Sequence, residues 1–262
     1  MGLAKGPGGR VIVHYIRTGG AVRASAKCCK IAAHPNSSLS PMTTAPACRH
    51  APATMRNREP LLEVLRDALP PLGTVLEIAS GTGEHAVFFA PRLVPRSWLP
   101  SDIDPLSLES IAAWRALQPA KNLLPPVRLD TLAPSWPPET CPPSPAINAI
   151  VAINLIHIAP WAACLGLLAG AARILPPDGV LILYGPFRQG GRHTSPSNSA
   201  FDESLRAQNP AWAVRDLEAI AQAASSSGLS LTRTVAMPAN NLSVVFTQDR
   251  TNTETCREKA KQ

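Results

Sequence analysis

The sequence predicts an α/β fold with a doubly wound, mostly parallel sheet and a terminal antiparallel strand pair. Five short apolar runs alternate with helical stretches, which is the pattern of repeated strand–helix units. The first run passes through a glycine-containing turn directly into a helix. Two alternating stretches, 229–237 and 242–247, follow around a Pro-Ala-Asn-Asn turn. Units of this kind place helices on both faces of one sheet.

The first half of the predicted domain begins with an amphipathic helix over 57–69, whose leucines recur at helical spacing. The breaker Pro70-Pro71-Leu72-Gly73 separates this helix from the first strand. In chain order we then expect a strand over 74–79, a helix over 85–90, a strand ending at 102, a helix over 105–117 and a strand over 126–129.

The second half begins with the stretch 131–146, which we expect to form neither strand nor helix because its prolines break both. The segment 188–213 is polar and lies between the fifth strand and the last helix, the usual place of a substrate lid. The remaining expected elements are a strand over 146–153, a helix over 160–175, a strand over 180–184 and a helix over 215–224.

The turn after the first strand indicates a nucleoside-bearing cofactor. Gly81 and Gly83 allow a tight turn and close approach of a ligand to the backbone. A dinucleotide-binding turn would have the spacing G-x-G-x-x-G, whereas Ala86 stands at the third position and Glu77 lies inside the strand. An acid there orders the loop or meets, through water, the amino end of S-adenosylmethionine. In the alternative interpretation, this is a plain corner in which Glu77 caps backbone amides.

Two further carboxylates follow the next strands. Asp102 comes first out of the second strand, where a carboxylate accepts from both hydroxyls of an adenosine ribose. Asp104 is placed to cap the helix that begins at Pro105. Asp130 follows the third strand, where it would accept from the adenine amino group. Three successive strands that end beside an acid favour the cofactor site over a scaffold.

The net charge of +7 comes from one end of the chain. Residues 1–58 carry nine Lys or Arg and no acid, so the remainder nets 7 − 9 = −2 and gives no support to a nucleic-acid surface. We expect a basic extension over 1–52, one α/β domain over 53–248 and a polar tail over 249–262. The extension has the composition of a transit peptide or of a disordered tail, which predicts a mitochondrial or plastid location in the first case and a cytoplasmic one in the second.

No apolar run reaches the roughly 18 to 20 residues of a membrane span, so we expect a soluble protein without a membrane partner. The six cysteines include no C-x-x-C and no histidine-paired metal spacing. We therefore expect free thiols and no metal site.

These residues make the chain resemble class I S-adenosylmethionine-dependent methyltransferases, and most closely the methyltransferase-like protein 26 group, also called domain of unknown function 938. The resemblance covers about residues 54–247. It rests on RNREP (56–60), LEIASGTGEHA (76–86), WLPSDIDPLSLESIAAW (98–114), INLIHIAPW (153–161), LYGPF (183–187), SPSNSAFDESLRAQNPAWAVRD (195–216) and MPANNLSVVF (237–246). It implies a Rossmann-like, seven-stranded sheet and a methyl donor, without a substrate. Ala79 departs from the first glycine of many methyltransferases.

The expected cofactor-binding residues lie in the first helix and at the ends of strands. They are Asn57, Glu77, Ala79, Ser80, Gly81, Gly83, Asp102, Asp130 and Asn154. The expected substrate-contacting residues are Tyr184, Phe187, Asn198, Asp202 and Arg215.

Asn154 and His157 are the expected catalytic residues, because an oxygen or nitrogen nucleophile of high pKa needs a base near the donor. The alternative is that His157 hydrogen-bonds to backbone at the start of a helix. His85 follows the glycine turn, and we expect at most a capping role for it.

The leading hypothesis is a methyltransferase acting on a small molecule. The second hypothesis is a non-catalytic, S-adenosylmethionine-binding or interaction protein that retained the methyltransferase fold, and the third is a nicotinamide-dependent oxidoreductase. The sequence leaves the acceptor and the oligomeric state open.

Overall fold

The computed structural model describes residues 48–249. The predictions for 1–47 and 250–262, which include most of the basic extension and the polar tail, lie outside these residues. Three cysteines, Cys48, Cys141 and Cys164, lie within them and are free thiols. Across 48–249 we find no helix that is both long and apolar enough to cross a bilayer.

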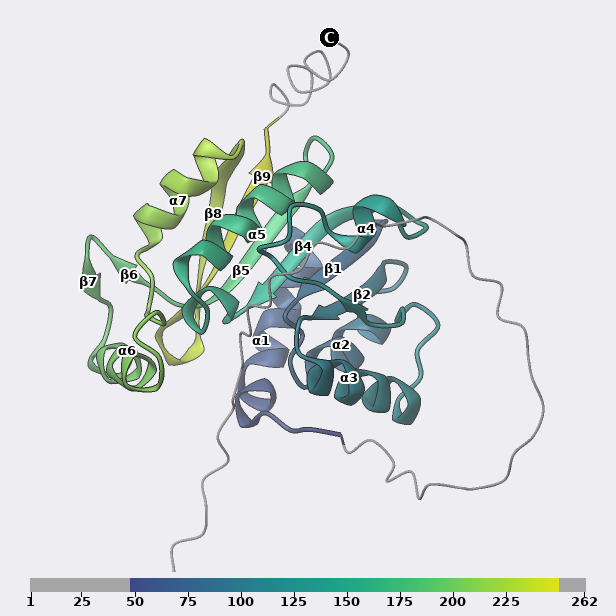
Figure 1. The fold of residues 1–262 in the computed structure, drawn as a ribbon, viewed down its shortest axis with the longest axis horizontal. Helices are drawn as coiled ribbons and strands as arrows, with labels where there is room; N and C mark the ends of the chain where they lie inside the picture. The colour runs from purple at the N-terminus through teal and green to yellow at the C-terminus, as the bar shows by residue number, and fades with distance from the viewer. Residues whose placement is uncertain (1–47, 250–262) are drawn as a thin grey trace, which may run out of the picture. The chain divides into compact units, whose positions relative to one another are not determined.

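A seven-stranded sheet forms the centre of the described domain, in the order β3-β2-β1-β4-β5-β9-β8 (Figure 1). All neighbours from β3 to β5 are parallel, whereas β9 is antiparallel to both β5 and β8. The strands are β1 Thr74–Ile78, β2 Ser97–Asp102, β3 Val127–Arg128, β4 Ile147–Ile153, β5 Val180–Pro186, β8 Leu229–Met237 and β9 Asn241–Gln248. The predicted Rossmann-like, doubly wound sheet with its terminal antiparallel pair is confirmed.

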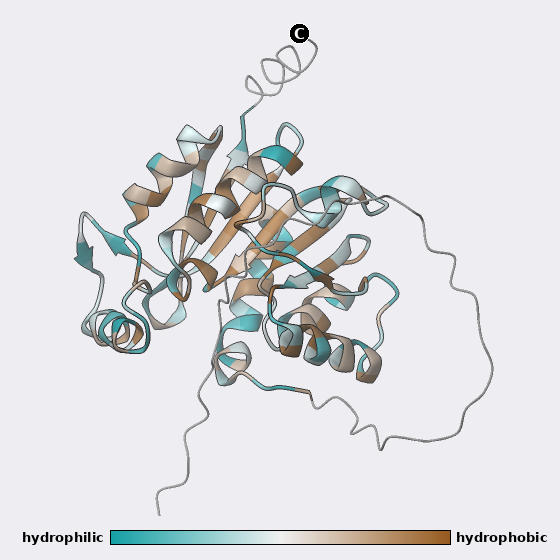
Figure 2. Cartoon of the chain, viewed as in Figure 1, coloured by the Kyte–Doolittle hydropathy of each residue, from teal (hydrophilic) through white to brown (hydrophobic). Residues whose placement is uncertain are grey.

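Helices cover both faces of this sheet. One hydrophobic cluster joins the first face to α1 (Pro52–Ala68), α2 (Glu84–Phe89) and α3 (Pro105–Leu117). The other joins the second face to α5 (Trp161–Ile174) and α7 (Leu217–Ser226), which lie in front of the strands in Figure 1. The central strands β4 and β5 are the most hydrophobic part of the sheet (Figure 2), as expected for parallel strands buried on both faces.

The strand order reverses between β1 and β4, which are hydrogen-bonded neighbours. In open α/β sheets, the crevice outside the carboxyl ends of the strands at such a reversal is the usual ligand site. The β1–α2 turn and the end of β4 both lie at this edge, so the fold brings together the two segments that the sequence singled out.

Two segments contain more structure than predicted. The proline-rich stretch includes a one-turn helix, α4 (Pro137–Thr140), because prolines at the first helical positions lack only N–H groups that would be unpaired anyway. The polar segment contains a short hairpin, β6 (Arg188–Gln189) and β7 (Arg192–His193), followed by α6 (Pro196–Gln208). Ser195 caps α6 by accepting from the Asn198 N–H at 3.2 Å.

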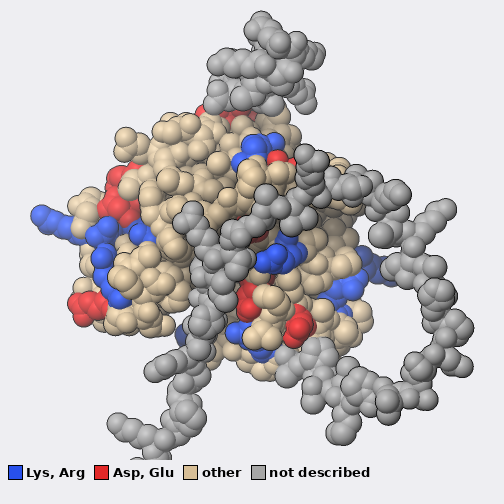
Figure 3. Space-filling model, viewed as in Figure 1, with Lys and Arg blue, Asp and Glu red and all other residues tan. Residues whose placement is uncertain are grey.

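Charges of both signs are distributed over the described surface. On the face drawn in Figure 3, Lys and Arg side chains lie among Asp and Glu side chains and among uncharged residues. Over 48–249 the sequence contains 15 basic and 16 acidic residues, so 15 − 16 = −1. The excess of positive charge therefore belongs to the parts of the chain outside this range.

Candidate functional site

The turn between β1 and α2, residues 79–83, is a tight loop with three residues in the left-handed backbone region. The φ angles are 56° at Ala79, 59° at Gly81 and 90° at Gly83. The Ser80 N–H donates to the Ser101 carbonyl at 2.8 Å, which fixes the loop to β2. Ala79 adopts the same left-handed conformation that a glycine would favour, so the missing first glycine does not change the path of the turn.

The two glycines of this loop have different surroundings. A Cβ added to Gly83 would lie 2.8 Å from the Ile111 Cα, so this glycine allows the loop to pack directly on α3. A Cβ added to Gly81 would meet no atom within 4 Å. The space beside Gly81 is therefore open to a ligand, which is the local condition for the predicted cofactor.

Asp102, at the end of β2, is buried and points at this loop. One carboxylate oxygen accepts from the Gly81 N–H at 2.9 Å, and the other accepts from the Asp104 N–H at 2.9 Å. Burial raises the pKa of Asp102, and the two backbone hydrogen bonds oppose that shift. Each oxygen can accept another hydrogen bond. Asp104 caps α3 as expected, accepting from the backbone N–H groups of Leu106 and Ser107. We call the loop 79–83 together with Asp102 the β1–β2 corner.

Glu77 lies beneath the loop, on the sheet face covered by α2 and α3. Its carboxylate accepts from the Trp98 indole N–H at 2.9 Å, and the side chain is buried. Burial raises the pKa of Glu77 to about 7, although the Trp98 hydrogen bond acts in the opposite direction. The side chain thus bonds to an indole and not to the backbone amides of the alternative interpretation.

Asp130 follows β3 and is half-buried. Its side chain accepts from the Leu132 N–H at 2.9 Å, a local turn. The Leu129 N–H donates to the Asp102 carbonyl at 3.0 Å, which brings the start of this turn beside the end of β2. Asp130 therefore lies next to the β1–β2 corner, with one oxygen free of any hydrogen bond to the described residues.

Asn57 connects α1 to the start of α2 and the end of β5. Its side-chain oxygen lies 2.8 Å from the His85 Nε2, which must carry the proton because an amide oxygen only accepts. Hydrogen bonds from Asn57 and Asn241 reach the Tyr184 hydroxyl, the latter at 3.0 Å, and oppose the rise in its pKa that burial causes. The sequence assigned His85 a capping role at most, yet the structure makes it part of this polar cluster.

The ends of β4 and β5 form a second corner, which we call the β4–β5 corner: Asn154, His157, Gly185 and Arg215. His157 has no exposed surface, and burial lowers its pKa to about 3. Its Nδ1 accepts from the Arg215 N–H at 3.3 Å. A Cβ on Gly185 would lie 2.5 Å from the His157 Nε2 and 3.1 Å from the Asn154 Oδ1. This packing favours the alternative in which His157 bonds to backbone over the expected catalytic base.

Arg215 and Phe187 were both expected to contact substrate. In the structure their side chains contact other residues of the β4–β5 corner. The Arg215 guanidinium donates to the carbonyls of Ile156, Ala159 and Ala211 at 2.7 to 3.0 Å. Phe187 is fully buried and packs edge-on against the His157 ring, with 5.1 Å between centroids. Phe187 therefore presents no surface to a substrate, which corrects that expectation.

The side chains of Asn198 and Asp202 likewise form hydrogen bonds within the protein. The Asn198 amide donates to the Thr194 hydroxyl and to the Asn240 carbonyl, at 3.0 and 2.9 Å. Asp202 is buried and accepts from the Val214 N–H at 2.7 Å and from the Arg206 Nε at 3.0 Å. The segment expected to be a substrate lid is thus fixed by these contacts over the β4–β5 corner.

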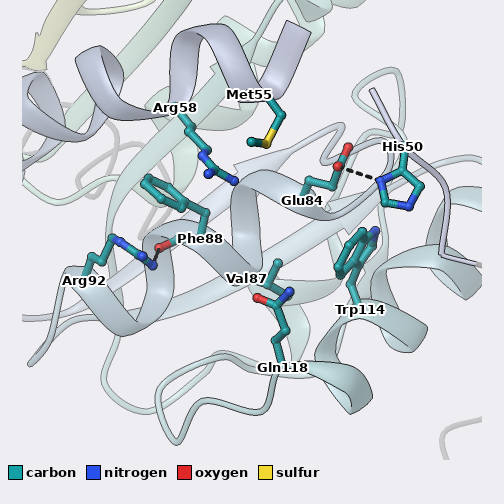
Figure 4. A pocket seen from close by; sticks show the side chains of 9 residues that line it. All are labelled: His50, Met55, Arg58, Glu84, Val87, Phe88, Arg92, Trp114 and Gln118. Atoms are coloured by element: carbon teal, nitrogen blue, oxygen red, sulfur yellow. Dashed lines mark hydrogen bonds and ion pairs between the residues drawn. The ribbon is translucent and has the colours of Figure 1, made fainter. Parts of the chain in front are cut away.

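A pocket of about 380 Å³ lies elsewhere, along the outer side of α2 (Figure 4). Its lining residues are His50, Met55, Arg58, Glu84, Val87, Phe88, Arg92, Trp114 and Gln118. None of them was predicted as a site residue. The sequence feature that could have indicated this pocket was Arg58 in the Arg-Asn-Arg run at 56–58. Only Asn57 of that run was predicted as a site residue.

Solved methyltransferase structures share this fold. The apo form of the S-adenosylmethionine-dependent methyltransferase SibL matches with a TM-score of 0.62 and 18% identity, over 76% of this chain and 56% of that one. An O-methyltransferase family protein from Burkholderia thailandensis matches with a TM-score of 0.62 and 14% identity, over 76% and 58%. Human N-acetylserotonin methyltransferase in complex with SAM matches with a TM-score of 0.58 and 13% identity, over 73% and 55%. The chain thus spans little more than half the length of these proteins.

The described domain therefore has the Rossmann-like fold of class I methyltransferases. The chain belongs to the family described as "Protein of unknown function (DUF938)", whose model matches residues 48–248. The family description assigns no substrate.

Proposed function

We propose that this protein is an S-adenosylmethionine-dependent methyltransferase that acts on a small molecule still to be identified. The observation that carries the proposal is the β1–β2 corner, where the buried Asp102 carboxylate holds the Gly81 N–H at 2.9 Å and the space beside Gly81 is open. Neighbours with the same fold include methyltransferases solved with SAM or SAH. The long matching segments also support membership in the methyltransferase-like protein 26 group.

In this proposal, different residues contact different parts of the cofactor. The loop 79–83, Asn57 and Asn154 hold the amino-acid end of the donor, with Glu77 ordering the loop from below. Asp102 accepts from the ribose hydroxyls, and Asp130 accepts from the adenine amino group. When bound, the cofactor supplies an electrophilic methyl group on a sulfonium. The protein then has mainly to position the acceptor and exclude water.

We assign the base for a protic acceptor to His85 in place of His157. His85 is half-buried, and burial lowers its pKa to about 4, so the ring is neutral at pH 7. Asn57 fixes the proton on Nε2, and Nδ1 has no hydrogen-bond partner among the described residues. His157, in contrast, already accepts the Arg215 N–H and has no exposed surface. Tyr184 remains the proposed acceptor contact, because its hydroxyl belongs to the same cluster as His85.

Calorimetry with S-adenosylmethionine and S-adenosylhomocysteine on the full chain tests the cofactor assignment. We expect both to bind, and Asp102→Asn to weaken binding at least about tenfold, because a neutral amide accepts the ribose hydroxyls less strongly than a carboxylate. Asp67→Asn is the matched control, since Asp67 is exposed and pairs with Arg233. Absence of binding by the wild type at millimolar concentration would overturn the proposal. Stabilisation by NAD alone would favour the oxidoreductase.

The second candidate is a protein that binds the cofactor without turnover. It is distinguished by incubating the protein with labelled donor and a broad panel of metabolites, and by analysing what co-purifies with it from native extract. Transfer of label that depends on His85 supports the enzyme. Binding without transfer to any acceptor or co-purified metabolite supports the second candidate.

A further inference from the structure

The pocket on the outer side of α2 is separate from the β1–β2 corner. It lies between α1, which contributes Met55 and Arg58, and α3, which contributes Trp114 and is followed directly by Gln118 (Figure 4). None of the residues assigned to the cofactor or the acceptor lines it. A ligand in this pocket would therefore not occupy the space beside Gly81, and an inference about it does not rest on the proposed function.

Two arginines that line this pocket contact the Phe88 ring. The Arg58 guanidinium lies 4.5 Å from the centroid of the Phe88 ring, and that of Arg92 lies 4.0 Å from the same centroid. Stacking on an aromatic ring uses the flat face of a guanidinium. The N–H donors of a guanidinium lie in its plane, so contact of the flat face with a ring does not use them.

Most of these donors have no partner among residues 48–249. Arg58 makes no hydrogen bond or ion pair there, and its Nε is buried without an acceptor. Arg92 makes one hydrogen bond, from its guanidinium to the Phe88 carbonyl at 3.0 Å. Arg173, in contrast, is paired with Glu139 at 2.9 Å. The terminal N–H groups of Arg58 and most of those of Arg92 therefore have no acceptor among these residues, and an anion in the pocket would supply one.

Glu84 is the one acid among the lining residues, and its oxygens are already engaged. They accept from the Ala51 N–H at 2.6 Å and from the Thr82 hydroxyl at 3.1 Å, and they lie 3.1 Å from the His50 Nδ1. Glu84 therefore holds the chain before α1 against the glycine loop, and neither arginine has an acidic partner within residues 48–249.

The remaining walls are apolar. Val87, Phe88 and Trp114 are buried side chains that line the pocket, and Met55 lies at its edge with 59% of its surface exposed. We propose that this pocket binds a small organic anion, whose carboxylate or phosphate accepts from Arg58 and Arg92 and whose apolar body packs against these side chains. Planar guanidinium groups are well suited to both anions.

Calorimetry of the full chain with phenyl phosphate, benzoate, inorganic phosphate and phenol tests this assignment. We expect phenyl phosphate or benzoate to bind, and the tighter of the two identifies the anion. Inorganic phosphate lacks the apolar body and phenol lacks the charge, so both should bind at least about tenfold more weakly. Arg58→Gln and Arg92→Gln should each weaken the organic anion about tenfold or more. Arg66→Gln is the control, because Arg66 is on the same helix but pairs with Glu63.

Met55→Glu provides a variant that leaves the packed interior intact, because Met55 is exposed. A negative charge at the edge of the pocket should weaken the anion, whereas Leu72→Glu, at a position with 63% exposure outside the pocket, should not. Absence of binding by both organic anions at about 10 mM would overturn the proposal. So would binding that all of these variants leave unchanged, or phenol binding as tightly as phenyl phosphate.

Discussion

The β1–β2 corner and the β4–β5 corner lie at the same edge of the sheet but use their polar residues differently. At the first, Asp102 and the loop 79–83 border open space beside Gly81. At the second, the segment after β5 covers the strand ends, and its backbone bonds to both sides of His157: the Ala213 N–H to the carbonyl at 3.0 Å and the Arg215 N–H to the ring. A polar residue after a parallel strand therefore predicts the edge, but not whether a ligand or the chain itself is its partner.

The largest expected effect is a loss of stability at acidic pH that is caused by His157 in the β4–β5 corner. Burial lowers the pKa of His157 from its usual 6.5 to about 3, so the folded state holds the neutral ring. The resulting stability is present above pH 6.5 and is lost as the pH falls toward 3, up to about 5 kcal/mol. Urea unfolding at pH 7.5 and pH 5 should show a loss of about 2 kcal/mol from this group.

His157→Leu should remove that part of the pH dependence, because the variant has no ring to protonate. His50→Gln is the control, since it removes an imidazole whose side chain is 69% exposed. An unchanged pH dependence in His157→Leu would mean that the imidazole reaches solvent, and the base role expected from the sequence would regain its basis.

The two glycines of the β1–β2 corner give the next effect. Gly83→Ala should destabilise the fold by about 4 kcal/mol, because its Cβ would overlap the Ile111 backbone and its φ is 90°. Gly81→Ala should destabilise it by only about 1 kcal/mol, because only the left-handed φ of 59° opposes the change.

For cofactor affinity we expect the opposite ranking: relative to the stability that each variant loses, Gly81→Ala should weaken cofactor binding more than Gly83→Ala. A methyl group at Gly81 points into the space that the cofactor is proposed to fill, so calorimetry should show weakened binding by a folded protein. If Gly81→Ala binds S-adenosylhomocysteine as tightly as the wild type, the open space beside this glycine is not the cofactor site.

Most of the fold could be predicted because local patterns determine it. α3 and β8 begin and end at the predicted residues, since Asp104 with Pro105 marks the helix start and alternation marks the edge strand. α4 was missed because prolines in the first turn of a helix look like breakers in sequence. α6 was missed because its polar face dominates its composition, and only a few of its residues are buried.

The site was predicted unevenly because side-chain partners lie far apart in sequence. The position of Asp102 beside the glycine turn was recognisable from the order of strand, turn and acid along the chain, which is a local pattern. The roles of His157 and Arg215 depend on a contact between residues 58 positions apart. The contact of His85 with Asn57, 28 residues earlier, was not apparent from the sequence for the same reason.

The pH dependence of stability that Glu77 causes provides a further test of the β1–β2 corner, because Glu77 lies beneath its loop. Burial raises its pKa from 4.5 to about 7, so the folded state favours the protonated acid. That stability is present below pH 4.5 and is lost as the pH rises to about 7, a change of about 3 kcal/mol. Glu77→Gln keeps an oxygen for the Trp98 indole, so it should be more stable than the wild type at pH 8 but not at pH 4.5.

Unfolding in urea at the two pH values measures this change, with the exposed Glu63→Gln as the matched control. Equal stabilities of Glu77→Gln and wild type at pH 8 would mean that the ionised carboxylate is satisfied in the folded state. Glu77 would then be available as a charge to the cofactor, which is the second role weighed for it from the sequence.

The smallest effect distinguishes a scaffold from a binding corner most directly. Arg215→Lys shortens the reach of the side chain and replaces a planar group that donates to three carbonyls, so stability should fall by about 1 to 2 kcal/mol. Affinity for S-adenosylhomocysteine should not change, in contrast to Asp102→Asn. Arg192→Lys, on the exposed hairpin, should change neither quantity. A loss of affinity without a loss of stability in Arg215→Lys would instead indicate that the β4–β5 corner binds the ligand. An arginine whose only role is to stabilise the fold can change ligand affinity only if its contacts within the fold, and with them the stability, are also lost.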